Sequence, residues 1–164
     1  MSESAFDPNL LLQAQITEVN EKRPPLPVEN PASQDGFYTA TIDKLTPKTG
    51  TIGKGDRTGQ PWMMVAVALK IDVPQQLQDA MRLPPVVTIT DSCFLDLTPQ
   101  GGMDNAPGRN GRQRQYREAL DMNKAGDVWS WERAVGRPLK LQIKHKISDT
   151  TGDILEEVGR LMKL

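Results

Sequence analysis

The chain has 164 residues, a hydrophobic fraction of 37% and a formal net charge of −1. This length fits one domain, and the low hydrophobic fraction indicates that part of the chain lies outside a packed core. With one cysteine (Cys93) and one histidine (His145), the chain has no disulfide framework and no zinc site built from several cysteines. No apolar run approaches the roughly 18 residues of a membrane span, and the start, MSESAFDPN, lacks the basic and apolar regions of a secretory signal. We therefore expect a cytoplasmic protein that does not enter a membrane.

Charge is distributed unevenly along the sequence. Residues 1–36 carry six acidic and two basic groups, whereas residues 108–146 carry ten basic and four acidic groups. A polyanionic partner responds to such a local basic region more than to the total charge.

Residues 1–35 form the first predicted unit. They include four prolines in RPPLPVENPASQDG and show little periodicity, which predicts an extended acidic arm ahead of a domain over residues 36–164. Within the arm, LLLQAQI (10–16) is compatible with a short strand or a helical turn. The charge asymmetry suggests that the arm competes for the basic region or bridges to another subunit.

Three stretches of the domain alternate in the way that strands do, at 37–45, 62–73 and 86–97. In the second stretch, the predicted inward side chains are Met63, Val65, Val67, Leu69, Ile71 and Val73, and the outward ones are Trp62, Met64, Ala66, Ala68, Lys70 and Asp72. In the third, Val87, Ile89, Cys93 and Leu95 are predicted inward, and Thr88, Thr90, Ser92 and Phe94 outward. Residues 46–61, rich in glycine, threonine and basic side chains, predict an exposed cationic loop.

Helical signals separate the third strand from two more. A short helix is predicted within 74–85, a second within 112–123 after a glycine-rich loop, and a third over VWSWERAVG, capped by Asp127. Alternation over 139–147, a TTGD turn and DILEEVGRLMKL predict a closing hairpin. Three strands, a helical insertion and two strands match the five-stranded OB-like barrel, a mainly β fold. A β-sandwich with a helical insertion is the alternative.

No catalytic set can be assembled from these residues. The glycine loops lack the spacing of a phosphate-binding loop, and the carboxylates are scattered, with Asp91 unusual on an apolar strand face. We expect Cys93 to be a small buried hydrophobic residue, His145 to be a partly buried strand residue, and Trp129 and Trp131 to close the end of the barrel. The sequence thus predicts a protein that is not an enzyme and uses no metal or cofactor.

A binding surface is predicted instead. Trp62 and Phe94 lie outward among small side chains, where a flat base can stack on them, and basic residues surround them. The predicted phosphate-binding cations on these strands and their loop are Lys44, Lys48, Lys54, Arg57 and Lys70. A second basic cluster of Arg109, Arg112, Arg114 and Arg117 contacts either phosphates or a neighbouring subunit, and Lys144 and Lys146 on the fourth strand complete the predicted set. Alternatively, Trp62 and Phe94 pack under the arm and the lysines are a solvated face.

The motifs GFYTATIDKLTPKTG, YREALDMN, WSWERAVGRPLKLQIKHK and GDILEEV, over about residues 36–160, resemble a family of small phage-encoded proteins found beside replication and recombination genes. Members of that family are regarded as OB-like single-stranded DNA-binding proteins. The resemblance implies a homo-oligomer that coats single-stranded DNA, or RNA, with little sequence preference in the cytoplasm of a phage host. The rival expectation is a structural or protein-binding phage protein, such as a virion component or an inhibitor of a host factor.

Overall fold

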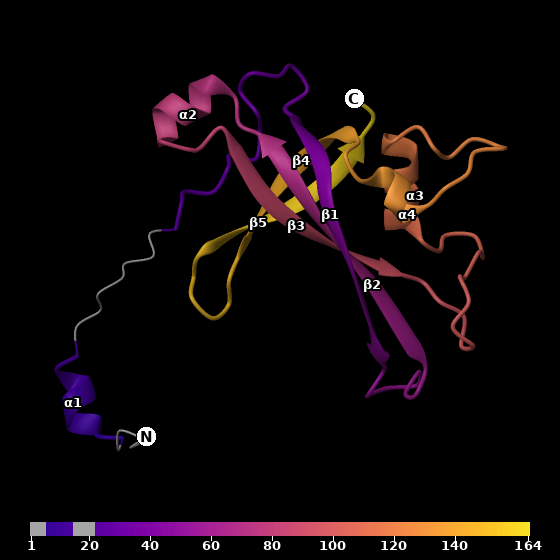
Figure 1. Cartoon of the computed structure of the whole chain (residues 1–164), viewed down its shortest axis with the longest axis horizontal. Helices are drawn as coiled ribbons and strands as arrows, with labels where there is room; N and C mark the ends of the chain where they lie inside the picture. The colour runs from indigo at the N-terminus through magenta and orange to yellow at the C-terminus, as the bar shows by residue number, and fades with distance from the viewer. Residues whose placement is uncertain (1–5, 15–21) are drawn as a thin grey trace.

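The computed structural model describes residues 6–14 and 22–164, and its centre is one antiparallel sheet. The strands are β1 (Tyr38–Thr51), β2 (Pro61–Asp72), β3 (Val86–Leu95), β4 (Pro138–Ile147) and β5 (Ile154–Met162). Their order across the sheet is β3-β2-β1-β4-β5 (Figure 1). The mainly β fold and the five predicted strands are confirmed, and the sandwich alternative is wrong because all five strands belong to a single sheet.

The first hairpin is longer than predicted. β1 runs on to Thr51 and β2 begins at Pro61, with Thr51 and Pro61 facing one another in the ladder. Residues 46–51 therefore belong to a strand, and only 52–60 form the loop. Their glycine and threonine content concealed the strand, because cross-strand pairing with β2 stabilises it more than the local sequence does.

Four helices are described: α1 (Pro8–Leu12) in the arm, α2 (Gln75–Met81) between β2 and β3, and α3 (Gly111–Ala119) and α4 (Trp131–Ala134) between β3 and β4. α3 ends earlier than predicted, and Asp121 just beyond it has a φ of 57°. α4 is capped by Ser130, which accepts the Arg133 N–H; Asp127 instead accepts the Lys124 N–H in the preceding turn. The predicted Asp127 cap is therefore wrong, because that carboxylate is used in a local turn.

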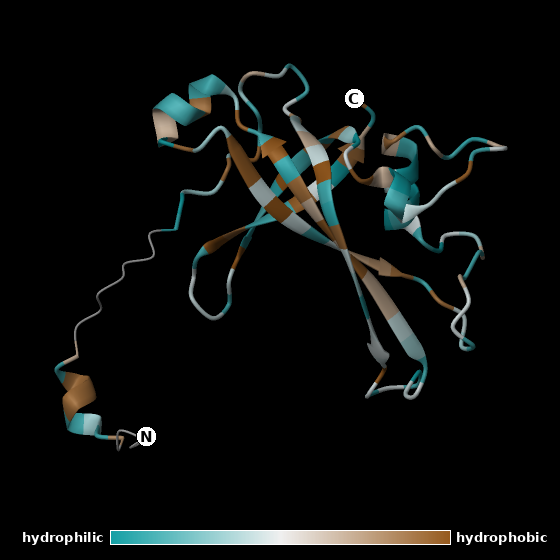
Figure 2. Ribbon diagram, viewed as in Figure 1, coloured by the Kyte–Doolittle hydropathy of each residue, from teal (hydrophilic) through white to brown (hydrophobic). Residues whose placement is uncertain are grey.

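The core follows from the period-two alternation of the strands. Val65, Val67, Leu69 and Ile71 of β2 are buried, and Val87, Ile89, Cys93 and Leu95 of β3 continue the same face. The alternating colours along β2 and β3 in Figure 2 reflect this division between a core face and an outer face. Burial raises the pKa of the Cys93 thiol to about 12, as suits the predicted role of a small buried hydrophobic residue.

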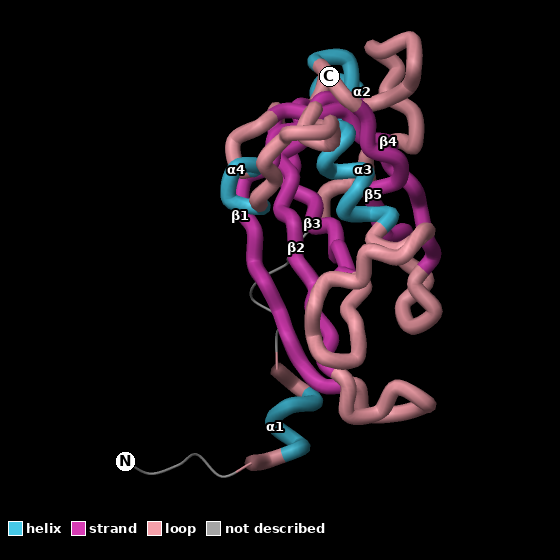
Figure 3. Tube along the Cα trace, turned by 90° about the vertical axis from the view of Figure 1, so that its right-hand side faces the viewer, coloured by secondary structure: helices cyan, strands magenta, loops and turns pink. Residues whose placement is uncertain are grey.

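A bulge between Ile42 and Lys44 divides the sheet into two parts. Before it, β1 pairs with both β2 and β4; beyond it, β1 pairs with β2 alone, and β4 continues with β5 alone. Bulges bend and twist strands, so the two parts diverge. Seen from the side, β1, β2 and β3 lie apart from β4 and β5, with α3 between them (Figure 3).

The predicted barrel does not close. β3 and β5 are the two edges of the sheet and approach each other without sharing a ladder. Arg112 of α3 joins them: its guanidinium bonds to Asp91 of β3 (Nε to Oδ2, 3.0 Å) and to the β5 carbonyls of Gly159 (2.6 Å) and Val158 (3.1 Å). Tyr116 donates its hydroxyl to the same Asp91 oxygen at 2.6 Å. We call Asp91, Arg112 and Tyr116 the edge clasp; it replaces strand pairing with side-chain hydrogen bonds.

From Lys22 onward, the predicted arm packs on the domain. Leu26 is fully buried, its N–H donates to Glu156 of β5 (2.7 Å), and its carbonyl accepts from His145 Nε2 of β4 (2.6 Å). Arg23 pairs with Glu156 at 2.6 Å, and the Tyr38 hydroxyl donates to the Pro27 carbonyl at 2.8 Å. The predicted strand or turn at 10–16 is helical over 8–12, and residues 15–16 lie outside the described part of the chain. Within 6–14 and 22–164, no helix is long and apolar enough to cross a membrane.

The edge clasp predicts a specific pattern of stability. Arg112→Met leaves Asp91 and two carbonyls without their donor, so we expect a loss of about 2–3 kcal/mol in the free energy of unfolding. Tyr116→Phe removes one hydroxyl and is expected to cost about 1 kcal/mol. Arg114→Met, on the exposed side of the same helix, is the control and should change stability by less than about 0.5 kcal/mol. Urea unfolding measures all three; equal losses at 112 and 114 would contradict the clasp.

A second prediction concerns how the stability of the fold changes at acidic pH. Asp35 accepts from Lys140 Nζ (2.6 Å), the Ser33 hydroxyl (2.6 Å) and the Phe37 N–H (3.0 Å), and these contacts hold the pKa of its carboxyl well below the usual 3.8. A carboxyl with a lowered pKa stabilises the fold above its unfolded-state pKa and loses that effect as pH falls. Asp35→Asn should therefore be less stable than the native chain at pH 7, with a difference that narrows below about pH 4.

Urea unfolding of both proteins between pH 7 and pH 3 tests this expectation. Asp149→Asn is the matched control, since Asp149 is exposed in the β4–β5 turn and forms no ion pair within the described residues. A difference between Asp35→Asn and the native chain that stayed constant down to pH 3 would contradict the assigned role of Asp35.

Candidate nucleic-acid interface

The outer face of β1, β2 and β3 brings the predicted site residues into adjacent rows. Strand register places Phe94 beside Met64 and Lys48, and Trp62 beside Gly50. The remaining rows hold mostly small side chains and one further lysine: Ser92, Ala66 and Thr46, then Thr90, Ala68 and Lys44. The predicted outward alternation of β2 and β3 holds in the register, which places two aromatic rings and two lysines on one surface, although Met64 on that surface is buried beside Phe94. We call this surface the β1–β3 face.

Trp62 and Phe94 lie next to each other on this face. Their ring centroids are 6.3 Å apart with an interplanar angle of 48°, and Phe94 is 62% exposed. The Trp62 indole occupies the space above Gly50, where a Cβ atom would lie 2.6 Å from ring atoms. Gly50 thus positions the indole, a cross-strand contact that the sequence analysis missed because register cannot be read from either strand alone.

The described part of the arm does not cover these rings. Residues 22–36 contact β4, β5 and Tyr38, through Leu26, Arg23 and Asp35. For this part of the chain, the alternative that Trp62 and Phe94 pack under the arm is wrong.

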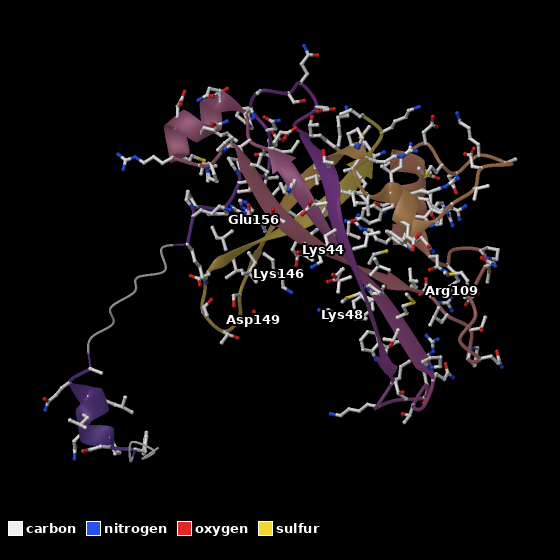
Figure 4. All side chains as sticks on the ribbon, viewed as in Figure 1. Lys44, Lys48, Arg109, Lys146, Asp149 and Glu156 are labelled. Atoms are coloured by element: carbon white, nitrogen blue, oxygen red, sulfur yellow. The ribbon has the colours of Figure 1, made fainter. Side chains whose placement is uncertain are left out.

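The predicted cations of the first hairpin differ in whether their side chains already have a partner within the described residues. Lys44 and Lys48 are exposed on β1 and form no ion pair within residues 6–14 and 22–164; Figure 4 shows both. Lys70 pairs with Asp43 at 3.3 Å. Lys54 lies in the exposed loop, whereas Arg57 donates to Gln60 and to the Leu97 carbonyl and so fastens the loop to the end of β3. Lys44 and Lys48 are therefore the cations best placed beside the two rings.

The other predicted cations lie elsewhere. Lys144 and Lys146 face Glu157 and Leu155 across the β4–β5 ladder, in the part of β4 that does not pair with β1 (Figure 4). Arg112 is committed to the edge clasp, with further donation to Gln115 at 2.9 Å. We therefore assign Arg112 a structural role in place of the predicted phosphate contact, because all three of its guanidinium nitrogens already donate hydrogen bonds inside the protein.

Arg109 and Arg114 line a cavity of about 350 Å³ beyond the end of β3, together with Arg117 and Trp129. Trp129 and Trp131 pack against the core, in keeping with the prediction, but Trp129 also forms a wall of this cavity. The sequence placed these arginines in one cluster without indicating the cavity, since the 103–110 loop that forms the opposite wall carries no periodic signal.

The described residues include no group of three or more His, Cys, Asp or Glu side chains that could hold a metal ion. His145 bonds to the arm but is exposed on β4, so its predicted partial burial is wrong; Asp91 bonds within the clasp, and Cys93 is buried. Each of the side chains considered for chemistry from the sequence thus has a structural contact.

No protein-family model matches the chain, and no curated protein matches its sequence. The resemblance to phage single-stranded DNA-binding proteins therefore stays a prediction.

The contact between Gly50 and Trp62 can be tested within the hairpin. In Gly50→Ala the new Cβ displaces the indole, so we expect the Trp62 indole N–H resonance to move and the affinity of the β1–β3 face for its ligand to fall. Gly53→Ala is the matched control, because a Cβ at Gly53 meets nothing within 4 Å. Two-dimensional ¹H–¹⁵N NMR spectra of the three proteins measure the effect; unchanged Trp62 signals in Gly50→Ala would contradict the contact.

Proposed function

We propose that the β1–β3 face binds single-stranded DNA with little sequence preference, by base stacking on Phe94 and Trp62 and by phosphate contacts to Lys44 and Lys48. The observation that carries this proposal is an exposed phenyl ring beside an indole, on the same sheet face as two lysines that have no acidic partner among the described residues; Lys48 shares the row of Phe94, and Lys44 lies two rows along β1. Aromatic platforms combined with a cationic track are how proteins bind single strands without reading sequence, and each stacked base contributes about 1–3 kcal/mol.

The surroundings of the rings favour an unpaired strand over a duplex. Met64 is the ladder neighbour of Phe94 and is only 9% exposed, but the next row holds the small side chains Ala66 and Ser92, and the Phe94 side chain stays 62% exposed. Bases expose their faces for stacking only when they are unpaired and unstacked, whereas a duplex presents its phosphates and groove edges. Lys44 and Lys48 are roughly 13 Å apart along β1 at the usual rise per strand residue, which spreads charge along a strand path.

The strand arrangement supports the finer assignment of an OB-like barrel. In that fold, described as partly open, the face of the second and third strands and the first loop bind oligonucleotides. Here the corresponding elements are β2, β3 and the hairpin loop 52–60. The motif resemblance adds the setting of this proposal, a non-catalytic protein in phage replication or recombination, acting as a homo-oligomer in the host cytoplasm.

A protein-binding role is the second candidate, and α1 favours it. The apolar side chains in and beside this short helix are exposed: Phe6 (80%), Leu10 (67%), Leu11 (60%) and Leu12 (84%). Such an exposed apolar cluster is typical of a segment that contacts another protein. It is compatible with single-strand binding, because α1 and the β1–β3 face are separate parts of the chain.

Fluorescence anisotropy of a labelled oligo-dT, at about 50 and about 300 mM salt, tests the main proposal. We expect the affinity for oligo-dT to fall steeply as the salt concentration rises, and duplex DNA to be a poor competitor. A parallel titration with oligo-rU compares RNA with DNA. Phe94→Ala should lower affinity by roughly 5- to 150-fold, from the loss of one stacked base. Lys48→Gln should reduce the salt slope by about 0.7.

Lys163→Gln is the matched charge control. Lys163 follows β5 and pairs with Asp121 at 3.0 Å, away from the β1–β3 rows. Its replacement should therefore leave the affinity and the salt slope close to those of the native chain. Absence of binding at 50 mM salt, or equal losses in Phe94→Ala and Lys163→Gln, would overturn the proposal.

A further inference from the structure

The cavity beyond β3 is open to solvent and is lined by the 103–110 loop, by α3 and by the segment around Trp129. Its volume is about 350 Å³, and the polar side chains that line it are Asp104, Asn105, Arg109, Asn110, Gln113, Arg114, Arg117, Asn123 and Trp129. Three of these nine side chains carry a guanidinium and one a carboxylate. The cavity is therefore cationic.

Hydrogen-bond donors in this wall lack acceptors. Arg117 Nε and Trp129 Nε1 are buried and have no partner within the described residues. The Arg117 guanidinium lies over the Trp129 ring, 5.7 Å from its centroid, which holds the two together. Gln113 is only 6% exposed, and its Nε2 has just the Met103 sulfur, a weak acceptor, at 3.6 Å. The guanidinium groups of this wall only donate hydrogen bonds, so a ligand bound to them must supply acceptor atoms.

The positive charge of the cavity favours an anionic ligand. Asp104 contacts Arg109 at 3.5 Å, while Arg114 is exposed and Arg117 is half-buried, neither with an ion pair in the part of the chain that the structure describes. Two positive charges are thus uncompensated at the cavity. Guanidinium groups bind phosphate oxygens through paired N–H donors, which makes phosphate the anion best matched to this wall.

The cavity wall is fastened to the end of the strand that carries Phe94. Asp96, two residues beyond Phe94, exchanges hydrogen bonds with Asn110: Asp96 N–H to Oδ1 (2.8 Å) and Asn110 N–H to Oδ2 (2.6 Å). Leu97 and Met103 form a β-bridge across the base of the intervening loop. The loop thus starts directly at the end of β3 and is anchored there, so the cavity lies beyond the end of the strand that carries Phe94.

We propose that this cavity binds a phosphate group of the nucleic-acid strand where it leaves the β1–β3 face, with Arg114 and Arg117 as its main ligands. The inference rests on the proposed function and adds a second contact to it. The phosphate is either an internal phosphodiester or a terminal monoester, and both present the acceptor oxygens that the wall requires.

The test observes both sites in one titration of the full chain. The indole N–H signals of Trp62 and Trp129, assigned with single Trp→Phe variants, are followed while dT10 without terminal phosphate is added. We expect both signals to move, because Trp62 reports the face and Trp129 reports the cavity. Repeating the titration with 5′-phosphorylated dT10 separates the sources: equal Trp129 shifts indicate an internal phosphodiester, and a shift only with the phosphorylated oligomer indicates an end.

Arg114→Gln measures the energetic contribution, since an exposed arginine can be replaced without loss of the fold. We expect its affinity for dT10 to fall roughly five- to tenfold and its salt slope to fall by about 0.7. Arg137→Gln, with the same charge change in the turn before β4, is the matched control and should keep native affinity.

Failure of the two proposals can be told apart. A Trp62 shift without a Trp129 shift, together with equal affinities of Arg114→Gln and Arg137→Gln, overturns the cavity proposal and leaves the face standing. No shift of either indole overturns both. A ten-residue poly-glutamate peptide that moves Trp129 as far as dT10 does, at the same concentration, overturns the assignment to phosphate and indicates a site for acidic proteins.

Discussion

The guanidinium of Arg112 joins two strands that no backbone ladder joins. β3 and β5 are both sheet edges, and a partly buried arginine between them bonds to a carboxylate of one and to two carbonyls of the other. Tyr116 shares the carboxylate, and burial together with the neighbouring Asp91 raises the pKa of its hydroxyl far above the usual value, so it remains a donor. The curved sheet therefore depends on a charge network for the closure that hydrogen-bonded strands provide in a complete barrel.

The same helix links this closure to the candidate binding surfaces. Residues three and four apart lie on one face of a helix, so Arg112 and Tyr116 share the side of α3 that contacts Asp91. Gln113 and Arg117, offset by one residue, share the side that lines the cavity. The clasp thus sets the position of the cavity wall, while the bulge at Ile42–Lys44 directs the first hairpin, with Lys48, Gly50 and Trp62, away from β4.

Alternating side chains identified the strands and the two faces of β2 and β3 correctly. A strand must direct successive residues to opposite sides, so Trp62 and Phe94 were assigned to the outer face before any pairing was known. Helix ends were less well predicted. Asp127 has the chemistry of a cap but is used in its own turn, and α3 stops before Asp121, outcomes that depend on how the chain continues into the next element.

Local pattern, then, determined the number of strands, their faces and the exposed aromatic and basic residues, because periodicity and composition are properties of neighbouring residues. Only the tertiary structure decided that Arg112 is a structural bridge while Arg114, two positions on, is exposed, that Gly50 positions Trp62, and that Leu26 is buried against β4 and β5. Each of these depends on contacts between segments far apart in the sequence. The register of strands and the packing of a helix between two edges set those contacts, and neither is encoded in any short stretch of the chain.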